Sequence, residues 1–373
     1  MDSITHLAAG VITPLAFRKA PRTGALVLFG IAAGQLPDID FVAGQGPHAM
    51  LALHRGVTHS IIAVFIFALV LALLLKFLLA QLRLKEMTVR VESGGAIINK
   101  ADDWPLGQMF LAALMGLSLH VYLDCMTTFG TQVLWPFSGY RIAIPAMFIV
   151  DFTFTVPLLL IMIYCLVGFK NEAKLDKQIK WARLGLLWAV CYPLACLGLN
   201  LGLTYKYNRD YTEIGTTVEK IQLTPVLGSP VYWKAIAENE REYHLAWVAA
   251  YKPLGEPKFH PAGYPKVNPE KWEALQKAVP IFKDYARFAS FPTVEQTWKG
   301  EDYVEYTYKD LRYLYSVPNF ILERSGFKDG LFNMQTRQDA KSGLIYAWRY
   351  LANGSDLSAM WTGLRPQVSL EKE

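Results

Sequence analysis

The sequence predicts an α-helical polytopic membrane domain, with short N-terminal helices and about four spans, followed by an α+β soluble domain. Hydrophobic residues make up 53% of the chain and charged residues only 18%, whereas soluble proteins carry about 25% charged residues. Long apolar segments are confined to the first half of the chain, and only 15 of the 37 basic residues lie there. We therefore place a transmembrane domain at residues 1–204 and an extracytoplasmic domain at residues 205–373.

The apolar segments follow one another in a simple order. Two short stretches, Leu7–Phe17 and Gly24–Leu36, come first and rise less than a full bilayer if they are helical. Longer segments, near the 20 or so apolar residues that a span needs, are expected at Ile61–Leu82, Leu106–Leu123, Met147–Phe169 and Leu184–Leu203.

Basic residues predict the orientation of the chain in the membrane. Three connecting segments are rich in lysine and arginine, and the segments between them are not. By the positive-inside rule the three basic segments are cytoplasmic, which places residues 205–373 on the opposite side of the membrane. The net charge of +5 is explained by these segments, so we expect no nucleic-acid partner. The basic residues concerned are Arg18, Lys19, Arg22, Arg83, Lys85, Arg90, Lys100, Lys170, Lys174, Lys177, Lys180 and Arg183.

The C-terminal domain shows the patterns of mixed α and β structure. Alternating apolar residues predict strands near Tyr243–Tyr251 and Tyr303–Tyr308. An amphipathic pattern predicts one helix within Pro269–Arg287. Nothing in this part of the sequence indicates a catalytic motif.

Seven histidines and aspartates lie at the predicted outward ends of the apolar segments. Each residue taken alone is compatible with a helix cap or an interfacial residue, and Thr58 is expected to cap the span at Ile61. Their shared position instead favours convergence on a metal, because ionisable groups at membrane depth are costly and usually functional. The seven residues are His6, Asp38, Asp40, His54, His59, His120 and Asp124.

Imidazole and carboxylate ligands define the class of metal that is expected. They suit zinc best, with manganese or iron as alternatives. His120 and Asp124 are four residues apart and project from one helical face. A set this large predicts two divalent ions, which together activate a water and stabilise an in-line displacement at phosphorus.

Several short motifs stand out within residues 5–138. They are Thr5-His6, Leu36-Pro37-Asp38-Ile39-Asp40, His54-Arg55-Gly56-Val57-Thr58-His59-Ser60, His120-Val121-Tyr122-Leu123-Asp124, Thr127-Thr128-Phe129-Gly130-Thr131 and Trp135-Pro136-Phe137-Ser138. In these motifs the sequence resembles the YdjM-like family of membrane-bound metal-dependent hydrolases, and the resemblance implies such an enzyme in the bacterial inner membrane. Looser matches to the family follow at Thr224-Pro225, Pro230-Val231-Tyr232-Trp233, Arg287-Phe288, Phe291-Pro292 and Asp310-Leu311-Arg312-Tyr313.

A more distant similarity concerns the metal sites of zinc phospholipases C and fungal-type zinc nucleases. These enzymes carry an Asp followed fourteen residues later by His, and a His-x-x-x-Asp; Asp40 with His54 and His120 with Asp124 have these spacings. The similarity implies that these four residues form the metal core, that Asp124 bridges two ions and that His6 serves the second ion. The later His…His-x-x-x-Glu set is missing, so a third metal is not expected.

The resulting hypothesis is a membrane-bound hydrolase that cleaves a phosphoester of a lipid or lipid-linked substrate at the periplasmic surface. Asp38 is the expected general base or orienting carboxylate, and Arg55 is expected to pair with the substrate phosphate. The C-terminal domain is expected to cover the site or select the substrate. The expected partners are membrane lipids and the lipid or lipid-linked phosphoester substrate, and the sequence does not identify a protein partner. The alternatives are a metallopeptidase or amidase, a non-catalytic scaffold stabilised by metal, and a transporter.

Overall fold

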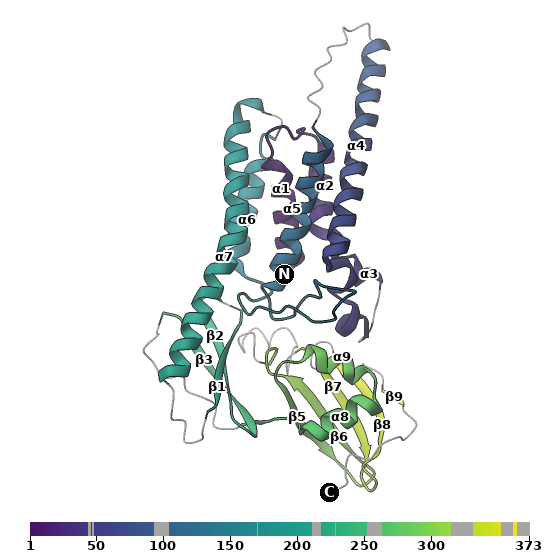
Figure 1. The fold of residues 1–373 in the computed structure, drawn as a ribbon, viewed down its shortest axis with the longest axis vertical. Helices are drawn as coiled ribbons and strands as arrows, with labels where there is room; N and C mark the ends of the chain where they lie inside the picture. The colour runs from purple at the N-terminus through teal and green to yellow at the C-terminus, as the bar shows by residue number, and fades with distance from the viewer. Residues whose placement is uncertain are drawn as a thin grey trace. The chain divides into compact units, whose positions relative to one another are not determined.

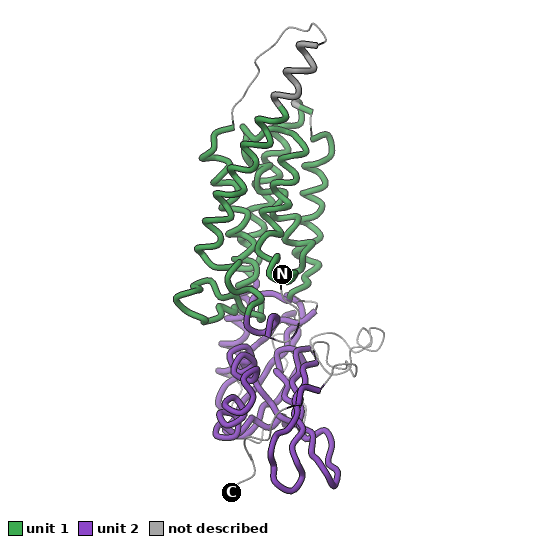
Figure 2. Tube along the Cα trace, turned by 90° about the vertical axis from the view of Figure 1, so that its right-hand side faces the viewer, with its two compact units in different colours: residues 1–44, 53–144, 149–195 green, residues 45–52, 145–148, 196–373 purple. Residues whose placement is uncertain are grey.

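The computed structural model divides the chain into two compact units (Figures 1 and 2). The helical unit comprises Met1–Gly44, Leu53–Ile144 and Ile149–Ala195, and the sheet unit comprises Gln45–Ala52, Pro145–Phe148 and Cys196–Glu373. The structure describes residues 1–43, 46, 48–92, 104–169, 171–210, 218–227, 229–251, 263–314, 331–351 and 361–363. The expected combination of a helical membrane part with an α+β part is confirmed.

The helical unit is a bundle in which α1 packs against α2, α5 and α6, while α4 packs against α5 (Figure 1). Within the described residues, four helical segments are long and apolar enough to cross a membrane: Gly24–Val42, Ile61–Leu82, Leu106–Cys125 and Leu175–Arg209. The α-helices are α1 (Ser3–Leu15), α2 (Gly24–Gln35), α3 (Asp40–Ala43), α4 (Ile61–Glu92), α5 (Leu106–Cys125), α6 (Phe152–Leu166) and α7 (Leu175–Asp210). The shorter turns are η1 (Leu36–Ile39), η2 (Ala49–Leu53), η3 (Val57–His59) and η4 (Glu172–Lys174).

Two expected spans differ from the helices that form. The segment expected at Met147–Phe169 is the shorter helix α6, because Asp151 caps its first turn and Gly168, with φ +71°, follows its end. Conversely, the short stretch expected at Gly24–Leu36 continues through η1 and α3 to Val42 and is long enough to span.

The start and end of α4 also differ from expectation. Ser60, rather than Thr58, caps the helix: its Oγ accepts a hydrogen bond from the amide of Ala63 at 3.1 Å. At the other end the helix continues to Glu92. Arg83, which is expected in a connecting segment, therefore lies on the helix. The apolar run is followed by residues with strong helix propensity, so no residue ends the helix earlier.

Glycines bring α1 and α2 unusually close together. A methyl group at Gly10 would lie 2.4 Å from the carbonyl oxygen of Gly30, and one at Gly34 would lie 2.3 Å from the carbonyl oxygen of His6. Gly30 and Gly34 form a Gly-x-x-x-Gly pattern, which permits close backbone contact between helices in a membrane. This contact fixes how the start of α1 meets the end of α2.

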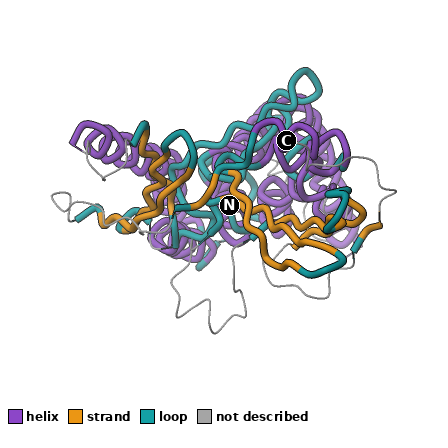
Figure 3. Tube along the Cα trace, turned by 90° about the horizontal axis from the view of Figure 1, so that it is seen from below, coloured by secondary structure: helices purple, strands orange, loops and turns teal. Residues whose placement is uncertain are grey.

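The sheet unit contains two antiparallel sheets, seen as separate groups of strands in Figure 3. One sheet has the order β1-β2-β3-β4, with β1 (Lys220–Pro225), β2 (Tyr232–Glu238), β3 (Glu242–Ala249) and β4 (Tyr264–Pro265). The other has the order β5-β6-β7-β8-β9, with β5 (Pro292–Lys299), β6 (Tyr303–Asp310), β7 (Asn333–Asp339), β8 (Ile345–Leu351) and β9 (Thr362–Gly363). The helices α8 (Pro269–Ala278) and α9 (Ile281–Phe288) precede the second sheet.

The expected strands at Tyr243 and Tyr303 are confirmed as β3 and β6. The single helix expected within Pro269–Arg287 is wrong, since α8 ends at Ala278 and α9 starts at Ile281. Pro280 supplies the physical reason, because proline has no amide hydrogen for a continuing helix and restricts the residue before it.

Candidate metal centre

The side chains of the candidate centre come from three segments of the helical unit. His120 and Asp124 lie one turn apart near the end of α5. Asp38 lies in η1, the turn that directly continues α2, and His59 lies in η3, just before α4. The order of the elements therefore brings residues that are far apart in the sequence to one end of the bundle.

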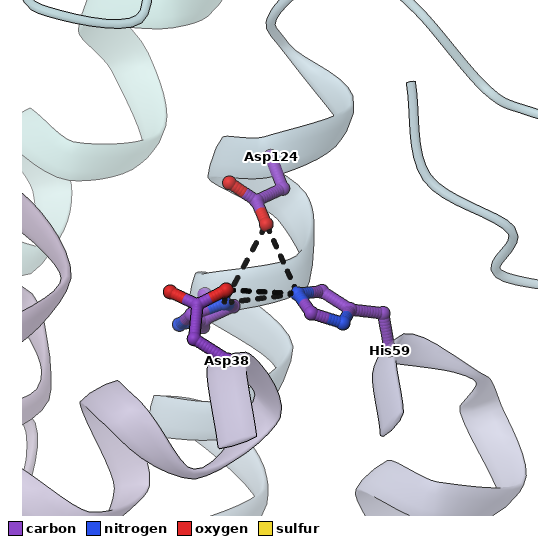
Figure 4. Close-up of side chains that lie close together, drawn as sticks. Asp38, His59 and Asp124 are labelled. Atoms are coloured by element: carbon purple, nitrogen blue, oxygen red, sulfur yellow. Dashed lines mark hydrogen bonds and ion pairs between the residues drawn. The ribbon is translucent and has the colours of Figure 1, made fainter. Parts of the chain in front are cut away.

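Four of these side chains converge on one point. Asp38, His59, His120 and Asp124 each offer one ligand atom, and these atoms lie within 4.8 Å of one another. His59 Nε2 lies 3.4 Å from Asp38 Oδ1 and 3.2 Å from Asp124 Oδ2. Figure 4 shows these three side chains pointing toward one another. His120 Nε2 lies 3.6 Å and 3.5 Å from the same two oxygens. Asp38 remains partly exposed, whereas the other three are buried.

Hydrogen bonds orient both imidazoles of this group. The Nδ1 of His120 lies 2.7 Å from the carbonyl oxygen of Gly34, so Nδ1 donates and Nε2 keeps its lone pair. Thr58 donates to Asp40 and lies 3.0 Å from Nδ1 of His59, which likewise leaves Nε2 of His59 as an acceptor. A backbone carbonyl such as that of Gly34 is a typical partner of a histidine that binds a metal, and the Thr58 hydroxyl connects His59 to the carboxylate of Asp40.

A second group of ligand type adjoins the first. The ligand atoms of Asp38, Asp40 and His54 lie within 4.8 Å of one another. Asp40 is held by the amide of Arg55 at 2.9 Å, and its Oδ1 lies 3.0 Å from His54 Nδ1. Asp38 is the carboxylate that both groups share.

His6 lies beside the first group and belongs to neither set of converging atoms. Its Nε2 is 3.0 Å from Asp124 Oδ1, and its ring stacks on His120 with centroids 3.6 Å apart. The same carboxylate oxygen contacts the amino group of Met1. His6 therefore positions Asp124 and His120 in this geometry.

Arg55 is buried against the same carboxylate. Its Nη2 lies 3.0 Å from Asp124 Oδ1, its Nη1 donates to Thr127 at 3.1 Å, and its guanidinium lies 5.0 Å from the centroid of the Phe129 ring. Its backbone has φ +56°, a left-handed conformation that is uncommon for a residue with a side chain. Two hydrogen bonds hold this conformation: the backbone amide of Arg55 donates to Asp40, and its carbonyl oxygen accepts from the amide of Gln132 at 2.8 Å.

The unpaired polar atoms of the site test whether a metal fits. Asp124 Oδ2 and His6 Nδ1 are buried and have no hydrogen-bond partner. The Nε2 atoms of His59 and His120 lie 3.2 Å apart, and each carries a lone pair in the arrangement described above. Such an arrangement is unfavourable by itself, since buried polar atoms need partners. A divalent cation among these nitrogen and oxygen donors satisfies them, and the donor set suits zinc, manganese or iron.

The structure brings six of the seven expected ligands into the two groups and places His6 in contact with the first. It differs from the analogy with the zinc phospholipases C in two respects: the carboxylate common to both groups is Asp38, not Asp124, and His6, implied as a ligand of the second ion, belongs to neither group. The sequence reasoning missed Gly34 and Thr58, which orient His120 and His59. A backbone carbonyl leaves no signal in a sequence, and Thr58 was assigned instead to the helix cap.

Comparison with known proteins identifies a family of inner membrane proteins, and the matching descriptions name no activity. The model of the "YdjM inner membrane protein" family matches residues 1–203. A relative, "Uncharacterized protein YfhP" of Bacillus subtilis (strain 168), is 28% identical over 152 residues, which cover 39% of this chain and 40% of that protein. No solved structure matches the chain. The family match covers more than half of the sequence and includes every residue of both groups, and the chain therefore belongs to the YdjM inner membrane protein family.

Proposed function

We propose that this protein is a metal-dependent hydrolase that cleaves a phosphoester of a lipid or lipid-linked substrate. The observation that carries the proposal is the position of Asp38, which belongs to two adjoining groups of metal-ligand type. Two such groups with one common carboxylate are the arrangement expected of a binuclear centre. When bound, the metal pair supplies an activated water and positive charge for an in-line displacement at phosphorus.

The residues of the chain have distinct roles in this proposal. Asp38, expected as a general base or orienting carboxylate, serves as the shared ligand and keeps the two ion positions together. The hydrogen bonds to Gly34 and Thr58 hold His120 and His59 in ligating orientations. Arg55 places a planar guanidinium beside Asp124, where it neutralises phosphate charge that enters the site.

Access to the site favours catalysis over a purely structural metal. A cavity of about 760 Å³ reaches Asp38, His54 and Arg55. Structural metal sites are closed by protein ligands, whereas catalytic sites keep an open position. The scaffold alternative therefore has less support, while a peptidase or amidase remains an outcome of substrate tests because the same centre also polarises a carbonyl.

The proposed setting is the bacterial inner membrane, with the site at its periplasmic surface. The three lysine- and arginine-rich segments of the sequence support this orientation through the positive-inside rule. On the same grounds the sheet unit is periplasmic. Its proposed role, to cover the site or to select the substrate, stays a prediction.

Elemental analysis combined with a phosphodiesterase assay tests the proposal. The detergent-purified wild type should hold about two divalent ions and cleave a chromogenic phosphodiester. The double variant His54→Ala/Asp124→Ala should lose both ions and the activity. The matched control is His48→Ala/Asp176→Ala, because these side chains are 66% and 73% exposed and lie outside both groups. Wild-type protein that holds no metal after reconstitution would refute the proposal, and metal without phosphodiesterase activity would favour the amidase.

A further inference from the structure

The cavity beside the metal centre has two chemically different walls. Its polar wall contains Asp38, His54 and Arg55, and its apolar wall contains Ile39, Phe41 and Val42. These six residues come from two short segments of the helical unit, one directly after α2 and one directly before η3. At about 760 Å³ the cavity has the size of a small-molecule site.

The polar wall suits an anionic group next to the second ligand group. The Nε of Arg55 is buried and has no hydrogen-bond partner, while its Nη atoms are paired with Asp124 and Thr127. His54 is 15% exposed in its side chain and belongs to the second ligand group. A phosphate at this wall finds both an arginine and the centre that we propose for its cleavage.

The apolar wall is too exposed to be explained as protein core. Ile39 is 51% exposed, Phe41 60% and Val42 81%. All three lie in the segment Gly24–Val42, which is long and apolar enough to span a membrane. Exposed apolar side chains on such a segment are expected to contact hydrocarbon, so this wall continues the lipid-facing surface into the cavity.

The two walls meet at one contact between aromatic rings. The ring of Phe41 lies edge-on to the imidazole of His54, with centroids 5.9 Å apart. A molecule that places its charge at His54 therefore meets apolar surface directly beside it. A fully water-soluble phosphoester leaves Ile39 and Val42 in contact with water and gains nothing from them.

From this geometry we infer that the cavity binds an amphiphile, with its phosphate at Arg55 and His54 and one alkyl chain along Ile39, Phe41 and Val42. The inference rests on the proposed function and specifies its substrate class: a phosphoester whose hydrocarbon chain is part of what the protein recognises. The alkyl chain of the substrate enters from the lipid phase beside α3, and the scissile phosphoester faces the metal centre.

Two chromogenic substrates separate this inference from the proposed function. They are 4-nitrophenyl phosphodiesters whose second ester group is methyl or dodecyl. Burial of a methylene contributes about 0.8 kcal/mol, so even partial burial of the chain should raise kcat/KM for the dodecyl compound by about 100-fold or more. Equal kcat/KM values for the two substrates would overturn the inference and leave the proposed phosphodiesterase intact.

Variants of the apolar wall locate the effect. Phe41→Ser should lower kcat/KM for the dodecyl substrate by about tenfold more than for the methyl substrate, because both substrates lose the contact of Phe41 with His54 but only the dodecyl chain loses the apolar wall. The matched control is Leu28→Ser, because Leu28 is 65% exposed on the same span and does not line the cavity. Val42→Thr serves as a milder variant if Phe41→Ser does not fold, with metal content as the check of folding. Equal losses in Phe41→Ser and Leu28→Ser would overturn the assignment of this wall.

Photolabelling tests the inference even if neither substrate is cleaved, a result that would count against the proposed function alone. A dodecyl phosphate with a diazirine on its chain should label residues 39–42 in the purified protein. Inorganic phosphate should compete only weakly, and unlabelled dodecyl phosphate strongly. Labelling spread evenly over the exposed apolar residues of Ile61–Leu82 would show unspecific association with the membrane surface and would overturn the inference.

Discussion

The helical unit and the sheet unit both bury charged groups, but they satisfy them differently. In the sheet unit, Arg312 donates from Nε to Asp310 at 2.8 Å and from Nη2 to the carbonyl of Phe288. Asp310 also accepts from the amide of Ser290 at 3.0 Å. The Nζ of Lys234 donates to the carbonyls of Arg312 and Leu314. These charges have local partners that complete them.

In the helical unit some buried polar atoms of the site lack a hydrogen-bond partner. Asp124 Oδ2, His6 Nδ1 and Arg55 Nε are buried without a hydrogen-bond partner. Among the described residues of the sheet unit, only the hydroxyls of Thr336 and Tyr350 share that condition. A buried charge whose hydrogen bonds are all made is a structural element, whereas converging polar atoms that lack hydrogen-bond partners indicate a missing ligand. The type of partner, and not burial alone, therefore distinguishes a site from a core.

The largest effects are expected where the charges of the helical unit are removed. Asp38→Ala should lose about two ions because both groups share this carboxylate, whereas His54→Ala should lose about one. Activity should fall at least about 10³-fold in Asp38→Ala, since both ion positions are lost. Elemental analysis with the phosphodiesterase assay measures both effects. A full complement of ions in Asp38→Ala would contradict the shared-ligand role.

The sheet unit should respond to the loss of a charge by unfolding. Asp310→Asn leaves the buried Arg312 without its carboxylate, which should destabilise the domain by about 3–5 kcal/mol. Thermal unfolding of the purified protein measures this effect. The ion content of the variant should stay as in the wild type at temperatures below the transition. Glu273→Gln is the control, because the pair of Glu273 with Lys277 is exposed and should not change the melting temperature.

A smaller effect is expected when the charge of Arg55 is kept and its shape is changed. Arg55→Lys should retain both ions, because Arg55 is not a ligand in either group. It should lower kcat/KM by about 10- to 100-fold, since lysine lacks the planar fork that pairs with phosphate oxygens. Kinetics beside elemental analysis check this result. Loss of metal in Arg55→Lys would instead give Arg55 a structural role like that of Arg312.

The smallest effect concerns pH and the sheet unit. Burial lowers the pKa of Lys234 to about 7, although attraction to Asp310 opposes the shift. Between pH 7 and the unfolded pKa near 10.4 the unfolded chain binds more protons, so this group makes stability rise with pH by at most about 1.4 kcal/mol per pH unit. Below pH 7 the gain is absent. Melting temperatures at pH 7.5 and pH 9 should show the rise in wild type and not in Lys234→Met.

The control for the pH experiment is Lys277→Met, because the side chain of Lys277 is 73% exposed. It should follow the pH profile of the wild type. An unchanged profile in Lys234→Met would show that another group causes the pH dependence.

Much of the fold is visible in the sequence because its signals are local. Apolar segments of spanning length predict α4 and α5, and alternation predicts β3 and β6. The errors arise where one residue overrides a pattern: Asp151 caps α6 after the expected start of a span, and Pro280 separates α8 from α9. The sequence does not predict that the helical segment continues from α2 through η1 and α3 to Val42, because Pro37 is typical of a helix end. Proline is nevertheless tolerated in the first turn of the short helix η1.

The residues of the candidate site are predictable from the sequence, but the contacts among them are not. The spacing of His120 and Asp124 on one helix is a local property, so their joint orientation follows from the sequence. Which carboxylate is shared depends on how η1 approaches α5, and this is a property of packing. The support that Gly34 gives to His120 likewise depends on the separation of α2 and α5.

Because α1 and α2 pack so closely, we expect substitutions at residues that are not metal ligands to disrupt the metal centre. Because Gly34 has no side chain, its backbone can lie against the backbone of His6, and its carbonyl oxygen is hydrogen-bonded to His120. In a screen of random alleles, Gly10→Ala and Gly34→Ala should therefore resemble the loss of a ligand rather than a loss of expression. Inactivating substitutions would then map to the glycines between α1 and α2 as well as to the ligand residues.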